Sequence, residues 1–226
     1  MSNNDTSVVS SLRRLISEGV YPPGERITEL DVAERLAISR TPVRLAFRTL
    51  EQEGLLQRAG KRGFAVREFS EEDVLCAVEV RGALEGLAAR RLAERGMTNE
   101  VSQSLKRCLE EGGRLLEKGY LIHDDIAQWS ALNQAFHEAI VAATGSQVIL
   151  DAINRNNHLP FASADSIIID TAALEKEYRK LHLAHQQHLL VYQALCQGEG
   201  ARAEMLMREH AYIGIRYGKL FELDPR

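Results

Sequence analysis

Apolar residues recur at intervals of three and four positions along most of the chain, which is the spacing of amphipathic helices. The first 67 residues contain three such stretches. Their expected buried stripes are Val9, Leu12, Leu15 and Ile16 in the first, Leu30, Ala33 and Leu36 in the second, and Val43, Ala46, Phe47 and Leu50 in the third. Thr28, with Asp31 three residues later, predicts the start of the second helix. Ser39 is expected to cap the third helix, and Gly54 suits its C-terminal end.

Two short stretches beyond the third helix have strand character. Residues 55–58 and 64–67 flank Ala59-Gly60-Lys61-Arg62-Gly63, a turn rich in glycine and positive charge. The order helix, helix, tight connection, helix and basic hairpin predicts a winged helix-turn-helix over residues 1–69. In that arrangement the third helix lies in the major groove of DNA, and the wing contacts the backbone or the minor groove.

The third helix carries a row of arginines on a face separate from its buried stripe. Arg40, Arg44 and Arg48 fall at i, i+4 and i+8, no acidic residue interrupts them, and the row is expected to be unpaired. A charged row of this kind is often only a solvated surface, but the basic wing beside it favours DNA binding. The expected DNA-binding residues are Arg40, Thr41, Arg44, Arg48, Lys61, Arg62 and Gly63.

Charge and cysteine content support two modules in a cytoplasmic protein. Residues 1–67 contain 11 basic and 8 acidic residues, whereas the remainder contains 17 basic and 24 acidic residues. A basic first module and an acidic second module are expected to have different partners. The three cysteines are far apart in sequence, which favours reduced thiols, and no apolar run is long enough for a membrane span.

Residues 70–226 show helical periodicity and no strand-like alternation. Ser70-Glu71-Glu72-Asp73 predicts the start of a long helix that ends near Arg95. Further helices are expected over residues 98–118, 124–144, 146–157, 171–197 and 199–221. The chain is therefore expected to be mainly α, with an all-α bundle as its second module. Residues 156–170 are the least regular part and are interpreted as a loop or a lid over a cavity.

Polar residues of the second module have a spacing that suits a metal site. Asn133 and His137 are four residues apart and share a helix face. His188 and His210 lie on two helices joined by the short turn Gly198-Glu199-Gly200, which would place them opposite each other. Such imidazoles can bind Zn²⁺, Ni²⁺ or Mn²⁺ inside a bundle. Taken alone, each histidine is more often an ordinary hydrogen-bonded core or surface residue.

Two further interpretations remain open at this point. Arg81 either forms an i, i+4 ion pair with Glu85 or holds the carboxylate of a ligand inside the bundle. A metal-dependent hydrolase is the alternative function, since a histidine-bound metal can activate water. The motifs for it are incomplete. His137-Glu138 lacks the second histidine of H-E-x-x-H, because that position is Val141, and Asp124 in the pair His123-Asp124 is interpreted as a helix cap. No enzymatic activity is expected.

Several segments of the first module resemble the DNA-binding domain of GntR-family regulators. They are Tyr21–Ile27, Ser39–Arg44, Leu50–Leu55 and Arg62–Val66. The resemblance implies a repressor that binds palindromic operator DNA as a homodimer. The family often has glutamate where this chain has Leu45, and the difference is expected to alter an ion pair near the arginines.

The second module resembles the FadR-type, or FCD, ligand-binding domain of the same family, over Arg81–Ala89, Asn133–His137 and His188–His210. In that domain an aspartate and three histidines typically bind a divalent metal beneath an effector cavity. The match falls on Asn133, His137, His188 and His210, with Asn133 in place of the usual aspartate. Arg81 and His185 are the expected effector contacts, and a substitute metal ligand is the alternative role of His185.

Parts of the second module resemble vanillate-responsive repressors of the VanR group still more closely. The segments are 79–86, 90–98 and 154–162. This resemblance implies a small carboxylic acid as effector, and specifically an aromatic one such as vanillate.

Overall fold

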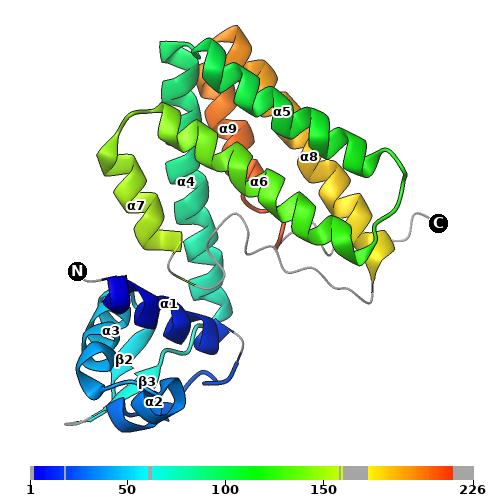
Figure 1. Cartoon of the computed structure of the whole chain (residues 1–226). Coiled ribbons are helices and arrows are strands. Elements are labelled where there is room, and N and C mark those ends of the chain that lie inside the picture. Colours follow the sequence, from blue (N-terminus) through cyan, green and yellow to red (C-terminus); the bar gives the residue numbers. More distant parts are fainter. Residues whose placement is uncertain (1–2, 18, 61–62, 158, 160–172, 216–226) are drawn as a thin grey trace. The chain divides into compact units, whose positions relative to one another are not determined.

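The computed structural model describes residues 3–17, 19–60, 63–157, 159 and 173–215 (Figure 1). Its helices and strands fall into two compact units, which are divided along the chain between Val74 and Leu75. The boundary expected from the sequence, between residues 69 and 70, lies just before helix α4, whereas this division lies within the first turn of that helix. Each unit is described separately.

The first unit is a winged helix-turn-helix. Its helices and strands are α1 (Asn3–Ser17), β1 (Arg26–Ile27), α2 (Glu29–Leu36), α3 (Arg40–Gln52), β2 (Leu56–Arg58) and β3 (Phe64–Val66). The strands form an antiparallel sheet in the order β1-β3-β2. Ala65 of the central strand β3 lies between Arg26 of β1 and Gln57 of β2. Strand β1 was not expected from the sequence, because two residues are too few to show alternation.

The core of this unit lies between the three helices and the sheet. Leu12, Phe47 and Leu50 are completely buried, and the rings of Phe47 and Phe64 meet edge to face with centroids 5.1 Å apart. Such contacts between the third helix and the wing fix the orientation of α3. The exposed face of α3 is therefore held rigidly for whatever it binds.

The expected ends of the helices are partly confirmed. Thr28 caps α2, since its Oγ1 accepts a hydrogen bond from the Asp31 amide at 3.2 Å. Gly54 follows α3 with φ of +79°, as a C-terminal cap requires. Ser39 has the extended backbone of an N-cap, but its side chain makes no capping hydrogen bond.

The expected burial of Leu30 is wrong. Its side chain is 52% exposed, and Val32 is completely buried instead. Helix α2 has only eight residues, and its contact with the core is made by a stripe through Val32, Ala33 and Leu36. Leu30 lies off that stripe, so the i, i+3 spacing of Leu30 and Ala33 was misleading in so short a helix.

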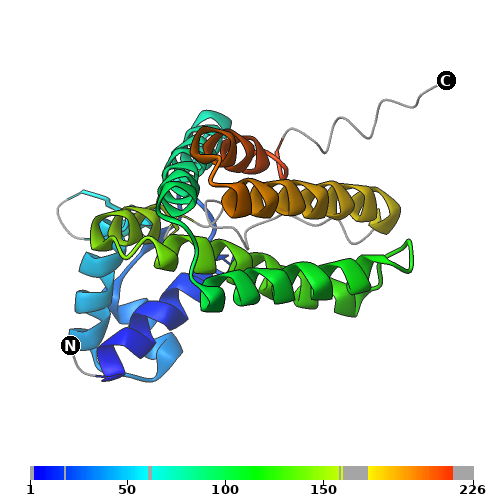
Figure 2. The same ribbon diagram turned by 90° about the horizontal axis from the view of Figure 1, so that it is seen from above.

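The second unit is a helical bundle, which confirms the mainly α class. Its described helices are α4 (Glu71–Arg95), α5 (Asn99–Leu116), α6 (His123–Ala143), α7 (Gln147–Asn157), α8 (Leu174–Gln197) and α9 (Gly200–His210). Figure 2 shows the long helices α5, α6 and α8 running alongside one another. Helices α8 and α9 form an antiparallel pair around Gly198, which has φ of +70°. No helix in the described ranges is both long and apolar enough to cross a membrane.

Two glycines allow α4 to approach α9 closely. A Cβ atom on Gly86 would lie 3.0 Å from the carbonyl oxygen of Glu204, and one on Gly82 would lie 3.3 Å from that of Arg208. Small residues at these positions therefore permit backbone-to-backbone contact that brings α4 against the histidine-bearing end of α9.

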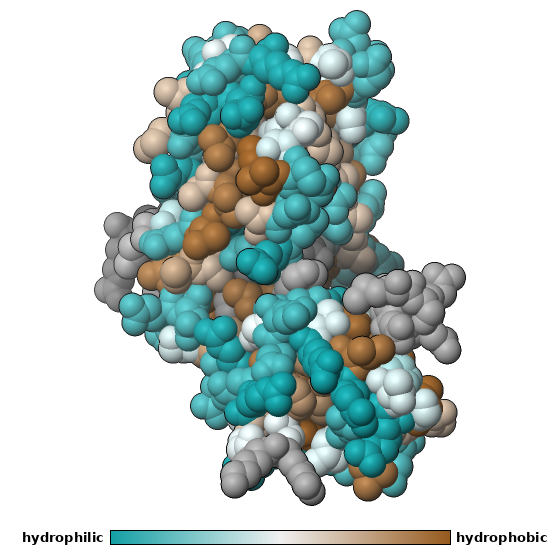
Figure 3. Space-filling view, turned by 90° about the vertical axis from the view of Figure 1, so that its left-hand side faces the viewer, coloured by the Kyte–Doolittle hydropathy of each residue, from teal (hydrophilic) through white to brown (hydrophobic). Residues whose placement is uncertain are grey.

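Apolar side chains also gather on one outer face of the helical unit (Figure 3).

Two expected helix ends in this unit are wrong. Helix α9 ends at His210 and is followed by turns to residue 215, whereas the sequence predicted a helix to residue 221, whose last part lies outside the described residues. Asp125, not Asp124, caps α6, because it occupies the third helical position and accepts a hydrogen bond from the Ile122 amide at 2.7 Å.

Candidate functional site

Three buried histidines from three helices meet in the centre of the bundle. His137 lies on α6, His188 on α8 and His210 at the end of α9, and none is more than 4% exposed. The Nε2 atom of His210 is 3.2 Å from Nε2 of His137 and 3.0 Å from Nε2 of His188. The short turn between α8 and α9 thus brings together residues that are 22 positions apart.

The other ring nitrogens of two histidines are held by acceptors. Nδ1 of His137 is 3.0 Å from Oε2 of Glu85, and Nδ1 of His210 is 2.9 Å from Oε1 of Gln187. A carboxylate oxygen and an amide oxygen can only accept, so each Nδ1 carries the proton in the neutral ring. The Nε2 atoms of His137 and His210 then face each other with two lone pairs. Such a contact calls for a cation between them.

Burial favours neutral imidazoles here. It lowers the pKa of His188 and of His210 well below the usual value. Neighbouring histidines lower the pKa of His188 further, and His137 and Arg81 lower that of His210. Burial raises the pKa of Glu85, but His137 and Arg81 outweigh it, so that carboxyl has a lowered pKa and is ionised. Histidines whose Nδ1 atoms are held by a carboxylate or an amide oxygen are oriented to bind a metal through Nε2.

The donor set fits a divalent metal ion. The ligand atoms of His137, His188 and His210 lie within 4.8 Å of one another. Among the residues that the structure describes, these three form the group with the spacing that a metal ion needs. Three imidazole nitrogens suit Zn²⁺, Ni²⁺ or Mn²⁺. Asn133 is on α6 one turn before His137 and is 2% exposed, so the same helix carries two of the four expected ligands into the core.

Aromatic rings cover one side of the histidine cluster. Phe136 stacks on His188 with centroids 4.2 Å apart, and Trp129 lies nearly parallel to the same ring at 6.1 Å. The indole N–H of Trp129 is buried and has no hydrogen-bond partner among the residues that the structure describes. His185 lies edge-on to Trp129 and is outside the three-histidine cluster, so it is not placed as a substitute ligand. Burial lowers the pKa of His185.

Arg81 connects α4 with the end of α9. Its Nη2 donates to the carbonyl oxygen of Ala211 at 2.9 Å, and its Nε is 3.9 Å from Oε2 of Glu85. Of the two interpretations from the sequence, the i, i+4 pair with Glu85 is the one present in this structure. The guanidinium helps to hold Glu85, which in turn orients His137.

A cavity of about 520 Å³ lies between α4, α6 and α7, on the Glu85 side of His137. Its described lining residues are Glu85, Gln134, His137, Glu138, Val141, Ala142, Leu150, Ile153, Asn154 and Asn157. These residues combine an apolar wall with carboxylate and amide groups, and they include neither Arg81 nor His185. An anionic ligand would be repelled by Glu85 and Glu138 unless a cation lay nearby.

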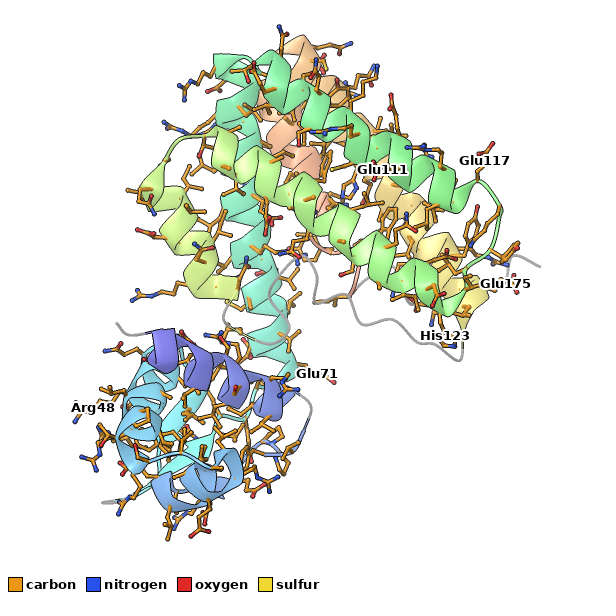
Figure 4. All side chains as sticks on the ribbon, viewed as in Figure 1. Arg48, Glu71, Glu111, Glu117, His123 and Glu175 are labelled. Atoms are coloured by element: carbon orange, nitrogen blue, oxygen red, sulfur yellow. The ribbon has the colours of Figure 1, made fainter. Side chains whose placement is uncertain are left out.

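In the first unit, α3 presents its arginines to solvent, but the expectation of an unpaired row is wrong. Glu29 of α2 forms ion pairs with Arg44 at 3.0 Å and with Arg40 at 3.2 Å. Arg48 points outward from α3 (Figure 4) and has no ion-pair partner among the residues that the structure describes. The sequence showed only that no acid lies on the same helix face. It did not show that α2 supplies one.

The other expected DNA-binding residues are placed as follows. Thr41 is exposed in the first turn of α3, and Leu45 is 45% exposed on the same helix. Gly63 precedes β3 with φ of +138°, a conformation that favours glycine. Lys61 and Arg62 lie outside the described residues.

Two family models match the chain in the order of its two units. Residues 4–66 match the bacterial regulatory proteins of the gntR family, and residues 76–212 match the FCD domain. The chain belongs to the GntR family and has an FCD domain. It is therefore a transcriptional regulator, whose family binds DNA through the first unit.

Known proteins resemble this GntR-family regulator along most of its length. A probable D-xylose utilization operon transcriptional repressor of Paenarthrobacter nicotinovorans is 31% identical, over 92% of this chain and 88% of that protein. The transcriptional repressor RspR of Escherichia coli is 28% identical, over 88% of this chain and 82% of that protein. The solved structure of E. coli McbR/YncC matches 98% of this chain and 100% of that chain with a TM-score of 0.64 at 22% identity, which shows the shared fold. The relatives named here are regulators, and no hydrolase is among them.

Replacement of Glu85 by Gln tests the link between α4 and the histidines. A neutral amide would hold the Nδ1–H of His137 less strongly and would remove a buried negative charge beside the cluster. We expect Zn²⁺ affinity to fall about 10- to 100-fold, the usual effect of losing a group that orients a ligand. Competition with a chromogenic chelator measures this. Glu117→Gln, at an exposed position near the end of α5, is the matched control and should bind like the wild type.

The lowered pKa values of His188 and His210 predict how the stability of the metal-free protein depends on pH. Unfolding returns both rings to the usual pKa near 6.5, so the unfolded state binds more protons below that pH. Stability is then lost as pH falls from 7 to 5, by up to about 1.4 kcal/mol per histidine for each pH unit below 6.5. Thermal unfolding in chelator at a series of pH values measures this. An unchanged Tm between pH 7 and pH 5 would contradict neutral, buried rings.

Proposed function

We propose that the protein is a repressor that releases its operator when a small carboxylic acid binds to a metal-containing FCD domain. The observation that carries the proposal is the meeting of three buried Nε2 atoms from α6, α8 and α9. The facing Nε2 lone pairs of His137 and His210 are costly in an apolar core, and a bound cation would stabilise them. A metal site of this kind in a regulator suits ligand sensing better than structural support, because a cavity borders His137.

The DNA contacts are proposed for the exposed face of α3 and for the wing. Arg40, Thr41 and Arg44 lie in the first turns of α3, the part of a recognition helix that reaches base edges. Arg48 and the wing residues Lys61, Arg62 and Gly63 are proposed to contact phosphates or the minor groove. Two copies in a homodimer would read the two halves of a palindrome, and the apolar outer face of the helical unit offers surface for such an assembly.

The proposed metal ligands are Asn133, His137, His188 and His210, with Zn²⁺, Ni²⁺ or Mn²⁺ as the ion. When bound, the ion would supply the positive charge that an anionic ligand needs in this acidic surrounding. Asn133 is a neutral ligand and would leave more positive charge at the site than aspartate. That charge favours a carboxylate as the effector.

An aromatic acid is the proposed type of effector, with vanillate as the first candidate. The cavity that borders His137 has an apolar wall that includes Val141, Leu150 and Ile153, against which an aromatic ring can pack. Arg81 and His185 are proposed to contact the acid. Arg81 would do so only by leaving Glu85 or Ala211, which would couple the ligand to the α4–α9 contact.

Release from DNA is proposed to follow from a change in the dimer. Ligand binding need only favour an arrangement in which the two recognition helices no longer match half-sites one DNA turn apart. The acid would then weaken operator binding without touching α3. DNA would weaken acid binding by the same factor.

Thermal unfolding with paired ligands tests this proposal. The metal-loaded protein is melted with vanillate, benzoate or acetate, and in parallel with vanillyl alcohol, which keeps the ring of vanillate but lacks the carboxylate. At least one acid should raise the Tm, the alcohol should not, and chelator should abolish the effect. Equal shifts with acid and alcohol, or shifts that survive complete metal removal, would contradict a carboxylate bound at the metal. Turnover of any added ligand would favour an enzyme instead.

A further inference from the structure

The carboxylate of Glu29 lies between two arginines of the proposed DNA-reading face. Glu29 is the first residue of α2, and its side chain is 22% exposed. It accepts a hydrogen bond from Arg44 Nε at 3.0 Å, a second from Arg44 Nη2 at 3.3 Å, and a third from Arg40 Nη2 at 3.2 Å. The two arginines are more than half exposed. A single acid thus binds two consecutive turns of α3 from outside that helix.

The contact with Arg44 uses one particular edge of its guanidinium. Nε and Nη2 form the side edge, and both donate to Glu29. The end edge, formed by Nη1 and the second hydrogen of Nη2, makes no hydrogen bond with the residues that the structure describes. That end edge is the one that can donate two parallel hydrogen bonds to O6 and N7 of a guanine. The acid therefore holds the side chain without occupying the donors that would read a base.

The arginines favour the charged form of this carboxylate. Hydrogen bonds from Arg44 lower the pKa of Glu29, and Arg40 lowers it further. Its place at the start of α2 adds the favourable field of a helix N-terminus. A fixed negative charge beside the arginines must also oppose close approach of phosphates, wherever along DNA the protein lands.

We propose that Glu29 is a specificity-determining residue, which positions Arg44 for base reading and weakens the attraction of this face to DNA of any other sequence. The proposal rests on the DNA-reading role proposed above for Arg44. An unrestrained arginine would swing to the nearest phosphate, which gives affinity but no sequence information. Held by Glu29, the same side chain gains most when a guanine meets its end edge. The expected consequence is a larger ratio of operator affinity to non-specific affinity.

The test uses full-length protein and a duplex that the wild type has selected from a random-sequence pool, with a scrambled duplex as the non-specific probe. Fluorescence anisotropy gives both dissociation constants at several KCl concentrations. Glu29→Gln should tighten binding to the scrambled duplex about two- to fivefold, as expected for removal of one exposed charge. It should reduce the ratio of the two affinities by at least about fivefold.

Two further variants separate position from charge. Glu29→Asp keeps the charge but is one methylene too short to hold both arginines, so it should lower the ratio while binding the scrambled duplex like the wild type. Glu51→Gln is the matched control, because Glu51 pairs with Arg58 Nε at the same 3.0 Å distance in the same unit. It removes the same charge and should leave the ratio unchanged. Each variant is melted first, and the Tm values should agree with the wild type.

A double variant shows whether Glu29 acts through Arg44. In an Arg44→Ala background, Glu29→Gln should no longer change the ratio of affinities. The proposal is overturned if the ratio stays within twofold of the wild type in Glu29→Gln, if Glu51→Gln lowers it equally, or if the double variant shows the full effect of Glu29→Gln. A wild type that selects no sequence at all would instead refute the proposed function, and the inference with it.

Discussion

His188→Ala is expected to lose metal binding almost completely. The change removes one of three Nε2 ligand atoms and leaves a cavity beside Phe136 and Trp129, whose rings lie nearly parallel to the imidazole. Two remaining histidines and Asn133 would make a weak site, so we expect affinity for Zn²⁺, Ni²⁺ and Mn²⁺ to fall at least about 100-fold. Metal content after dialysis, determined by mass spectrometry, and chelator competition measure the loss.

The matched control is His123→Ala. His123 is exposed at the start of α6 (Figure 4) and far along that helix from His137, so its removal should leave metal content unchanged. Because His188→Ala also removes buried ring contacts, its folding is checked by circular dichroism. His188→Gln, which better fills the space, should show the same metal loss. Full metal occupancy in a folded His188 variant would refute this ligand assignment.

Arg44→Ala is expected to cost about 1–3 kcal/mol of operator binding, or roughly 5- to 150-fold in Kd, if its guanidinium donates to a guanine. The loss should depend on sequence, because the variant would tolerate substitutions at the base pair that Arg44 reads. Arg48→Ala should instead weaken binding to all sequences alike and reduce the slope of log K against log salt by about 1, as for a lost phosphate contact. Anisotropy titrations with the selected duplex and its single-base variants distinguish the two.

The control for Arg44→Ala is Arg58→Ala. Arg58 lies in the same unit, and like Arg44 it forms an ion pair with a glutamate through Nε at 3.0 Å. Its side chain is 65% exposed, but it lies on β2 and not on the recognition helix. Its loss should change operator affinity by less than the loss of Arg44 and should not alter base preference. If Arg44→Ala bound the selected duplex and all its variants like the wild type, Arg44 would have no part in recognition.

Periodicity and turn residues predicted most of the fold. Local chemistry determines where two helices begin, at Thr28 and at Glu71, and where α3 ends, at Gly54. Capping groups and left-handed glycines act within a few residues, so the sequence shows them directly. The errors lie where tertiary contacts decide. Leu30 is exposed because the packing of α2 is set by its neighbours, and α9 stops at His210, where Arg81 binds the carbonyl of Ala211.

The meeting of His137, His188 and His210 was expected from helix geometry together with the resemblance to the FCD domain. Asn133 and His137 share a face of α6, and an antiparallel turn brings His188 opposite His210. The groups that orient these rings were not predictable, because Glu85 and Gln187 contact them across helices whose packing the sequence does not define. Glu29 was missed for the same reason. Nothing in α3 indicates that an acid from α2 lies on its arginines.

The most direct test measures the Kd for the operator with and without the acid that gives the largest Tm shift. It compares the wild type with His188→Ala, after both proteins have been incubated with the same metal. The acid should weaken operator binding of the wild type at least tenfold. It should have no effect on His188→Ala, which should still bind the operator because α3 is unchanged. An equal response of both proteins to the acid would contradict the central claim that the histidine cluster controls DNA binding.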